Sequence, residues 1–478
     1  MSAALATAVL AGCGGSSPGA APANPTTQVL SYFPSATPFV MTLSTAAKSQ
    51  SVQSQQALMR KVPALAIAET ALFAKLSQVG IDYNRDIRPL FGKPIAAGAA
   101  GAALSGTHTP FLVAWVTNSA AKLNALAAKI TALRSVGTHD GAKLLTANGA
   151  AVAISGSTLL LSGSISDLEA ALDRHAHQQG LTAAEYAQAT TGISSSGAVQ
   201  MFGDLKGALA SPSAAKARAV PWVAAIKSYG VSLNATANGM SMRFHIDTSG
   251  APLTAAQLPI ASGLSSPPLS GDMPVQAAVR DPAQIITFIE AAVRVTAPAQ
   301  YAKFLSQSSS LKRRSGFDVN ALVGMLTGAL GVESDTHSTL MRAQVSNPSQ
   351  AAAMIAKLVH SGALPPRSHV TTLGTGLYSL HSAGSSSTEM LGVIDSYLVL
   401  GQASPNQLRA FAAAPASAAS TGAGSVSFRI ALAELLRLTL KDRLPTITQQ
   451  YLSLLGDFSG SASATTGGLS GTATLTLR

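Results

Sequence analysis

The chain has 478 residues, of which 47% are apolar, 11% are charged and 5% are aromatic. This composition excludes an intrinsically disordered chain, which needs low hydrophobicity and high net charge, and the length predicts at least two domains. The formal net charge of +11 could indicate an anionic partner. The basic residues are scattered, however, with Lys312-Arg313-Arg314 as their one cluster. Because no basic face is interleaved with aromatic residues, we expect no nucleic-acid partner.

The single cysteine, Cys13, follows a short apolar run at residues 3–12. The run is too short to span a bilayer, which takes about 20 residues, and it is typical of the hydrophobic region of a secretory signal. Leu10-Ala11-Gly12-Cys13 matches the bacterial lipobox. The match implies that residues 1–12 are a signal-peptide remnant and that the Cys13 sulfur, as a nucleophilic thiolate, receives a diacylglycerol group.

The lipobox match lacks one expected feature, because no Lys or Arg precedes Cys13. Either the translation start lies upstream or the match is accidental and Cys13 is an ordinary buried residue. We favour an upstream start, since residues 13–27 are rich in Gly, Ser, Pro and Ala and predict a flexible tether. We therefore expect a lipid anchor at the extracytoplasmic face of the cell membrane. No later segment reaches 18 uninterrupted strongly apolar residues, so the lipid would be the sole anchor.

A hairpin followed by a capped helix is predicted in the first half of the chain. Two strand-like runs, 150–155 and 158–162, are joined by Gly156-Ser157. A glycine at the first central position suits a type II′ turn. The pattern from Ser166 to Glu169 then predicts a capping box at the start of a helix.

The same order of elements returns in the second half. Runs 391–394 and 397–400 flank Asp395-Ser396, and Ser404 to Gln407 is again a capping box, with Pro405 at the first helical position. Further pairs of segments keep this order: 111–130 with Asn118 as cap and 340–358 with Asn347 as cap; 80–92 and 316–328; and the strand pairs 231–247 and 458–477. Ordered pairs of this kind indicate an internal duplication.

We therefore predict an α+β fold of two similar lobes, each an antiparallel sheet packed with helices. The first lobe would cover residues 28–250 and the second residues 268–478, joined by the Ser/Pro/Gly-rich linker from Ser262 to Ser270. Helices are expected at 51–79, 282–296, 431–440 and 447–455. Thr and Ser on alternate positions of the last strand pairs predict a sheet with one solvated face.

These features resemble an uncharacterised family of actinobacterial lipoproteins that is classed as a domain of unknown function. The resemblance covers most of the mature chain and rests on the lipobox, the tether, Tyr32-Phe33-Pro34, Asp86 to Gly92, the strand-cap-helix unit at Val113 to Leu126 and the hairpin before Asp167. It implies duplicated α+β lobes at the cell envelope. It brings no activity, cofactor or catalytic residue.

Matches to catalytic motifs occur in unsuitable contexts. Gly15 to Gly19 has the pattern of a nucleophile elbow but lies in the tether, not between a strand and a helix. Ser119 to Lys122 and Ser213 to Lys216 match Ser-x-x-Lys without the motifs that accompany it in penicillin-interacting enzymes. His175 and His177 are two residues apart, whereas helical metal ligands are spaced i, i+4. We expect no metal, no cofactor and no nucleotide site.

The most plausible convergence of polar residues joins Asp335 and His337 with His381, on predicted neighbouring strands. We expect these residues to be solvated instead. The acidic residues show no spacing suited to a carboxylate pair. Those considered are Glu290, Glu333, Asp335, Glu389 and Glu434.

The sequence thus favours a non-enzymatic binding or interaction module of the cell envelope, whose partner would be an unidentified envelope ligand or protein. Two alternatives stay open. One is a carrier of an apolar envelope molecule in a lobe cavity, which the apolar composition permits. The other is a cell-wall hydrolase. A carrier needs a continuous apolar cavity, and a hydrolase needs polar groups gathered in a cleft.

Overall fold

The computed structural model describes residues 25–45, 53, 54, 57, 73, 74, 76–78, 80–101, 110–147, 149–193, 199–236, 238–262, 266–361, 364, 368–374, 376–382, 388–414, 424–440 and 452–478. Cys13 and the signal-like segment lie outside these residues. So do most of the helix predicted at 51–79 and residues 447–451 of the helix predicted at 447–455. Among the described residues, no helix combines the length and apolar character needed to cross a membrane.

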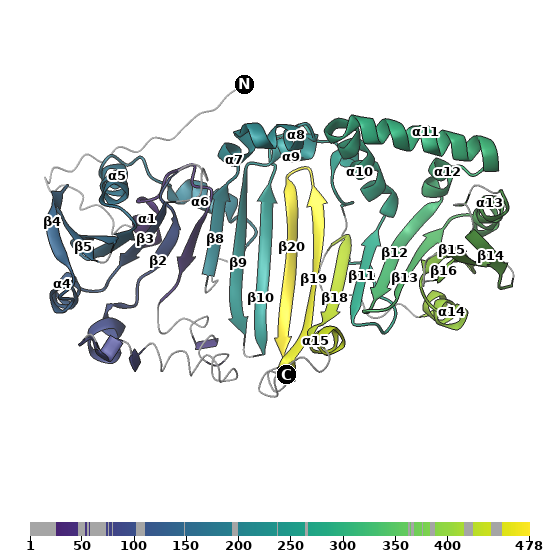
Figure 1. Cartoon of the computed structure of the whole chain (residues 1–478). Coiled ribbons are helices and arrows are strands. Elements are labelled where there is room, and N and C mark those ends of the chain that lie inside the picture. Colours follow the sequence, from purple (N-terminus) through teal and green to yellow (C-terminus); the bar gives the residue numbers. More distant parts are fainter. Residues whose placement is uncertain are drawn as a thin grey trace, which may run out of the picture.

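The described strands form one 20-stranded antiparallel sheet (Figure 1). The strands of the first half are β1 (Val40–Leu43), β2 (Ile95–Ala99), β3 (Phe111–Val116), β4 (Arg134–His139), β5 (Ala142–Ala147), β6 (Ala150–Ser155), β7 (Thr158–Ser162), β8 (Val199–Asp204), β9 (Ser228–Thr236) and β10 (Gly239–Asp247). Those of the second half are β11 (Val275–Arg280), β12 (Leu326–Ser334), β13 (Thr339–Val345), β14 (Ser368–Thr372), β15 (Leu377–Ser382), β16 (Thr388–Ile394), β17 (Tyr397–Gly401), β18 (Val426–Ala431), β19 (Leu455–Thr465) and β20 (Gly468–Leu477).

Helices flank this sheet in both halves. In the first half they are α1 (Pro25–Leu30), η1 (Tyr83–Ile87), η2 (Arg88–Leu90), α4 (Ala120–Lys129), α5 (Ile165–Ala176), α6 (Ala183–Ala189), α7 (Lys206–Ala210), η3 (Pro212–Ala214), α8 (Ala215–Arg218) and α9 (Pro221–Ala225). The short η4 (Ala255–Gln257) precedes the second half, which holds α10 (Pro282–Thr296), α11 (Pro298–Ser315), α12 (Val319–Gly324), α13 (Pro348–His360), α14 (Pro405–Ala413) and α15 (Leu432–Leu440). The fold is therefore α+β, as predicted.

The two halves have the same sheet topology. In the first half, β1 pairs with β2 and β8, β3 pairs with β2 and β7, and the hairpins β4-β5-β6-β7 and β8-β9-β10 complete the set. In the second half, β11 pairs with β12 and β18, β13 pairs with β12 and β17, and β14-β15-β16-β17 and β18-β19-β20 complete it. This identity of connections supports the predicted duplication.

The halves join through their last strands, β10 and β20, which pair antiparallel. Both strands leave equivalent turns, in which Gly239 lies opposite Thr236 and Gly468 lies opposite Thr465. Arg243 of β10 therefore pairs with its own equivalent, Thr472 of β20. A two-fold rotation about this pair exchanges the halves. Figure 1 shows the exchange, because α4 and α13 lie at diagonally opposite corners, as do α5 and α14.

The predicted hairpins superpose turn on turn. Gly156 and Asp395 both have a positive φ, of 56° and 52°, at the first central position of their turns. The second central residues also correspond, because Ser157 O accepts from Thr117 N at 2.8 Å and Ser396 O accepts from Val345 N at 2.9 Å. The capping box of Ser404 and Gln407 is confirmed. The helix at 282–296 and the solvated alternate positions of β20 are confirmed as well.

Two predicted caps are wrong by one or two residues. Helix α4 is capped by Ser119, whose Oγ accepts from Lys122 N, because the Asn118 side chain instead donates to Phe91 O. Helix α5 is capped by Ser164 rather than Ser166, because the helix begins directly after β7.

Two predicted helix boundaries are wrong. Leu455 begins β19 instead of ending a helix, three residues after the helical Leu452, and Ala431 ends β18, one residue before α15 begins. Both residues take part in strand pairing, Leu455 with Leu477 and Ala431 with Asp457.

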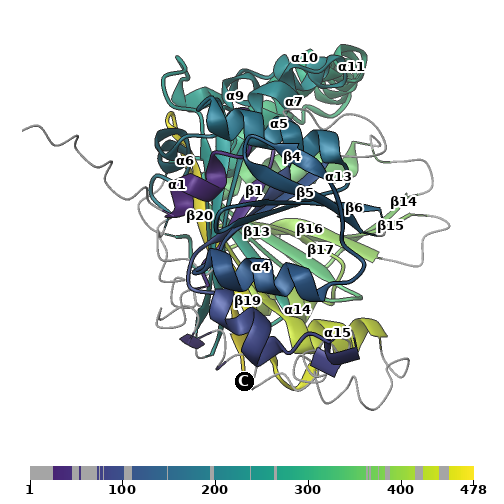
Figure 2. The ribbon, with the colours of Figure 1, turned by 90° about the vertical axis from the view of Figure 1, so that its left-hand side faces the viewer.

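In both halves, each face of the sheet carries one of a pair of equivalent helices. One face carries α4 in the first half and α13 in the second, and we call it the α13 face. The opposite face carries α5 and α14, and we call it the α14 face. Figure 2 shows the sheet from its first-half edge, with α10 and α11 at one end of the strands and α15 at the other.

Candidate functional site

The two faces of the central strands differ in polarity. Successive residues of a strand point to opposite faces, so each cross-strand row belongs to one face. One row of the α14 face passes through the pseudo-two-fold axis, and we call it the polar row. It comprises Thr42, Gln200, Ser232, Arg243, Thr472, Ser461 and Ser427. The adjacent row lies on the α13 face, and we call it the apolar row. It comprises Leu43, Val199, Leu233, Met242, Ala473, Gly460, Phe428 and Ala277.

The apolar row of the α13 face is partly exposed. Met240 is 40% exposed and Met41 is 36% exposed on the same face. Phe428, Met242 and the neighbouring Phe244 are half-buried. An apolar surface that spans several strands is larger than the scattered exposed side chains of an ordinary soluble surface, and such surfaces mark interaction sites.

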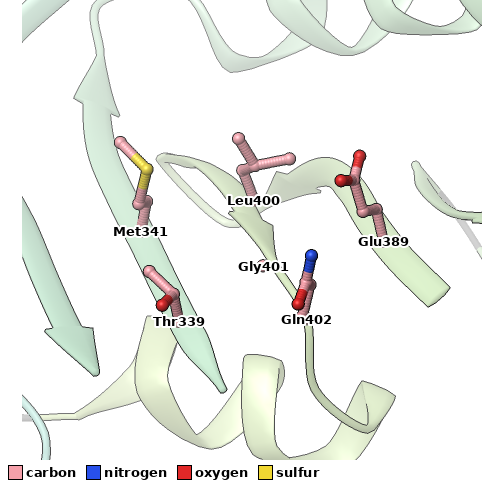
Figure 3. A pocket seen from close by; sticks show the side chains of 6 residues that line it. All are labelled: Thr339, Met341, Glu389, Leu400, Gly401 and Gln402. Carbon is pink, nitrogen blue, oxygen red and sulfur yellow. The ribbon is translucent and has the colours of Figure 1, made fainter. Parts of the chain in front are cut away.

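A shallow pocket lies on the same face near β13, β16 and β17 (Figure 3). Its volume is about 220 Å³. Met341 and Leu400 lie opposite each other on β13 and β17, and the carboxylate of Glu389 stands beside them. Leu400 is 38% exposed. This pocket extends the apolar row towards the edge of the second half.

A larger pocket, of about 490 Å³, opens on the α14 face of the second half, and we call it the α14 pocket. Volumes of this size suit small organic ligands. Its walls come from the loop before β11, the β12–β13 hairpin, α14 and α15. The lining residues are Gly271, Asp272, Met273, Pro274, Glu333, Asp335, Leu340, Gln407, Ala410, Phe411, Ala414, Glu434 and Leu438.

Arg342 does not line this pocket but hydrogen-bonds two residues that do, Phe411 and Ala414, and it is 6% exposed. Its Nη1 donates to Phe411 O at 2.6 Å, to Ala412 O at 2.9 Å and to Ala414 O at 2.9 Å, and its Nη2 donates to Ser270 Oγ. These carbonyls lie at the C-terminal end of α14, where carbonyl groups run out of intrahelical partners, and Phe411 O also accepts from Ala414 N. The guanidinium also lies over the rings of Tyr397 and Phe411, at 4.9 and 5.3 Å from their centroids.

Glu333 lies in the wall of the pocket and is 4% exposed. Its Oε2 accepts from Asp272 N at 2.9 Å and from Met273 N at 3.2 Å. Gly271 has a φ of +88°, and a Cβ there would collide with the Glu333 carboxylate. Gln276, which is 3% exposed, donates to Gly271 O and Met273 O. A buried polar network therefore fixes the loop at the mouth of the pocket.

Burial sets the electrostatics of this network. Desolvation raises the pKa of Glu333, and the two backbone donors and nearby Arg342 oppose that rise. Desolvation likewise lowers the pKa of Arg342. Both shifts have the direction expected when charged groups leave water.

The equivalent place in the first half is apolar. Registers β1–β2–β3 and β11–β12–β13 align Val40 with Gln276 and Gly98 with Glu333, since Val40 lies opposite Gly98 as Gln276 lies opposite Glu333. Leu112 and Leu340 lie opposite these residues on the next strand. Two residues further on, Arg342 therefore corresponds to Ala114.

The N-terminal segment fills this part of the first half. Leu30 and Phe33 are 0% exposed and Tyr32 is 1% exposed, and they belong to the same core cluster as Val40 and Ala114. The segment is held at the end of α5, because Arg174 donates to Tyr32 O and the His175 ring stacks on Tyr32 at 4.3 Å.

Helix α6 covers the polar row of the first half. Tyr186 places its hydroxyl 3.0 Å from Thr42 Oγ1 and donates to Gln200 Oε1 at 2.9 Å. Burial raises the pKa of Tyr186 to about 12. The neutral hydroxyl thus satisfies two polar groups of the sheet.

The proposed convergence of Asp335, His337 and His381 does not occur. Asp335 and His337 lie in the β12–β13 turn, where Asp335 Oδ1 accepts from His337 N and Ser338 N. His381 lies on β15, and β17 and β16 separate β13 from β15. Neighbouring strands are about 4.8 Å apart, so the three residues do not share a site.

The remaining motif residues are structural where they are described. Ser119 caps α4, and Ser213 is paired with Ser211 at the surface. His177 Nδ1 contacts Asp173 O. The structure adds one group that the sequence did not indicate, in which His139 Nε2 lies 2.7 Å from Asp173 Oδ1 and 3.9 Å from Asp140 Oδ2. Its members are half-buried or exposed on the surface.

The acidic residues that lack pairing in sequence are brought together in space. Glu333, Asp335 and Glu434 line the α14 pocket with Asp272, while Glu389 lines the pocket of Figure 3. Sequence reasoning missed Arg342, although a charged residue in the middle of an apolar strand was a usable signal. Its alignment with Ala114 in the repeat makes that signal specific.

No family model and no curated protein matches the chain. Solved structures of TP0453 in crystal forms III, IV and I match with TM-scores of 0.27, 0.28 and 0.27 at 10% identity. The form III match covers 47% of this chain and 82% of that one.

Proposed function

We propose that the protein is a lipid-anchored binding module at the extracytoplasmic face of the cell membrane, and that the α14 pocket is its ligand site. The observation that carries the proposal is the divergence of the two halves at one place. One copy keeps an apolar core there, filled by Leu30 and Phe33, and the other has Gln276, Glu333 and Arg342 around a pocket. Such a change is costly for a core unless the pocket has a use.

The arrangement favours binding over catalysis. Arg342 donates to backbone carbonyls and Glu333 Oε2 accepts from two backbone N–H groups, so both side chains support the walls of the pocket. No metal or cofactor is required by this proposal. We infer that the anchor is a diacylglycerol on Cys13 and that the chain is a member of the lipoprotein family that it resembles.

The pocket is tested with a pair of equivalent substitutions. Ala410 is exposed on α14 and lines the pocket, and its equivalent on α5, six residues after the capping serine, is the exposed Ala170. Ala410→Trp should fill the pocket and abolish recovery of a co-purified ligand from native membranes, detected by mass spectrometry. Ala170→Trp should retain the ligand. Equal recovery from both variants would place the ligand elsewhere.

The anchor is tested separately. Full-length protein expressed from an upstream start should incorporate a fatty-acid analogue, and Cys13→Ser should not. Labelling of the Cys13→Ser variant would show that the anchor is wrong without bearing on the pocket.

A second candidate, a carrier of an apolar envelope molecule, is favoured by the apolar row of the α13 face. Leu475 and Thr474 are neighbours on β20 that point to opposite faces. Leu475→Gln should weaken binding of a fluorescent fatty-acid probe, and Thr474→Gln should not. Equal affinities in the two variants would exclude the α13 face as the lipid site.

A further inference from the structure

We infer that the α14 pocket takes an organic cation, an alkylammonium or guanidinium group carried on an apolar stem; the inference rests on the proposed binding function. The first observation is the charge of the pocket. Its described lining includes Asp272, Glu333, Asp335 and Glu434 and no lysine, arginine or histidine. The chain as a whole has a net charge of +11. The pocket is therefore an acidic site on a basic protein.

The second observation concerns one atom. Glu333 is 4% exposed, and its Oε2 accepts both backbone N–H groups. Among the described residues, no hydrogen bond is made to Glu333 Oε1. Because Oε1 has no donor among the described residues, it can accept a hydrogen bond from a bound ligand. Because Glu333 lines the pocket, a donor that enters the pocket would satisfy it.

The cation that acts on Glu333 through space, Arg342, makes its hydrogen bonds elsewhere. Arg342 donates to three carbonyls at the end of α14 and to Ser270 Oγ. It lowers the cost of the Glu333 charge through space but makes no hydrogen bond to it among the described contacts. The carboxylate is therefore held in place by the backbone and left with an open acceptor.

The remaining walls suit a hydrocarbon stem. Met273, Leu340, Phe411 and Leu438 line the pocket together with Ala410 and Ala414. Leu340 and Phe411 are 1% and 2% exposed and belong to the same core cluster. A lining that combines acidic and apolar groups matches a cation on a short hydrocarbon chain, and the volume of about 490 Å³ exceeds what a bare metal ion would fill.

The test measures binding of matched probes to the full-length protein in detergent by calorimetry. The probes are n-hexylamine, n-hexylguanidine, n-hexanol, hexanoate and Ca²⁺ alone. The two cations should bind, and n-hexanol and hexanoate should bind at least tenfold more weakly. Glu333→Gln should weaken cation binding at least tenfold, and Glu389→Gln, on the other face, should leave it unchanged.

A second variant covers the case in which Glu333→Gln does not fold. The exposed pair Asp272→Asn with Glu434→Gln should fold and weaken cation binding severalfold; unchanged affinity would overturn the inference. Equal binding of n-hexanol and n-hexylamine, or Ca²⁺ binding that displaces hexylamine at equal affinity, would also overturn it. If no cation binds while Ala410→Trp still loses the native ligand, the cation is wrong and the proposed binding function stands.

Discussion

The two halves of this protein share the same pattern of strand pairing and differ in how they fill the space beneath α5 and α14, the helices that follow the β6–β7 and β16–β17 hairpins. In the first half, Leu30, Tyr32 and Phe33 pack under α5 against Val40 and Ala114. In the second half, the place of Val40, Gly98 and Ala114 is taken by Gln276, Glu333 and Arg342, and a pocket opens under α14. The comparison teaches that one duplicated topology tolerates an apolar or a polar interior, provided that every buried polar group finds a partner.

The largest loss of stability should come from removing a buried side chain of the N-terminal segment from the core of the first half. Phe33→Ala should lower the free energy of unfolding by about 4 kcal/mol, because Phe33 is fully buried and its loss leaves a cavity. Chemical denaturation measures the change. Phe111→Ala is the control, since Phe111 is 50% exposed and should change stability little. Equal effects of the two substitutions would contradict the filling role of the N-terminal segment.

A slightly smaller loss should follow from breaking the polar network of the second half. Arg342→Met should cost about 3 kcal/mol, because three carbonyls, Ser270 and the buried Glu333 lose their cation. Adding Glu333→Leu should recover part of the loss, since no uncompensated charge then stays buried. Arg429→Met, which removes an exposed ion pair with Asp457, should cost less than about 1 kcal/mol. Wild-type stability of Arg342→Met would refute the network.

The mouth of the α14 pocket should be sensitive to one methyl group. Gly271→Ala should cost about 2 kcal/mol, from the positive φ and from displacement of the Glu333 carboxylate. Gly250→Ala is the control, because Gly250 also has a positive φ, of +73°, but a Cβ at Gly250 would meet only the end of the Lys227 side chain. The difference between their unfolding midpoints isolates the contact with Glu333, and equal midpoints would show that Glu333 does not depend on Gly271.

The smallest effect should be a pH dependence confined to the first half. Burial lowers the pKa of His175, so the unfolded chain binds more protons and stability falls as pH drops below about 6.5. His175→Phe keeps a ring against Tyr32 and should flatten this slope in thermal unfolding scans. A slope that is unchanged in His175→Phe would rule out this residue.

A second histidine opposes the first and provides the background for that measurement. The hydrogen bond with Asp173 raises the pKa of His139, so its contribution is full below about 6.5 and is lost as pH rises through its folded pKa. The thermal scans that compare His175 with His175→Phe are therefore best done in a chain that also carries His139→Asn. In that chain only the acid-side loss of stability should be seen.

Periodic strands and caps could be found in the sequence because they depend on neighbours in the chain. The hairpins at Gly156-Ser157 and Asp395-Ser396 follow from local turn chemistry, and the repeated order of caps indicated the duplication. The alternating Thr and Ser of β20 likewise indicated one solvated face. The proposed lipid site at Cys13 also rests on a local pattern and stays a prediction.

Only the tertiary structure decided how the halves meet and where a pocket forms. The pairing of Arg243 with Thr472 joins residues far apart in the chain, and no local pattern selects one edge strand over another. Glu333, Asp335 and Glu434 form no recognisable pattern along the sequence. The β12–β13 hairpin and α15 nevertheless place all three around the α14 pocket. Arg342 lies in the middle of β13, and only the fold brings its guanidinium to the end of α14. Local propensity acts over a few residues, whereas a buried charge becomes tolerable through partners that only the folded chain supplies.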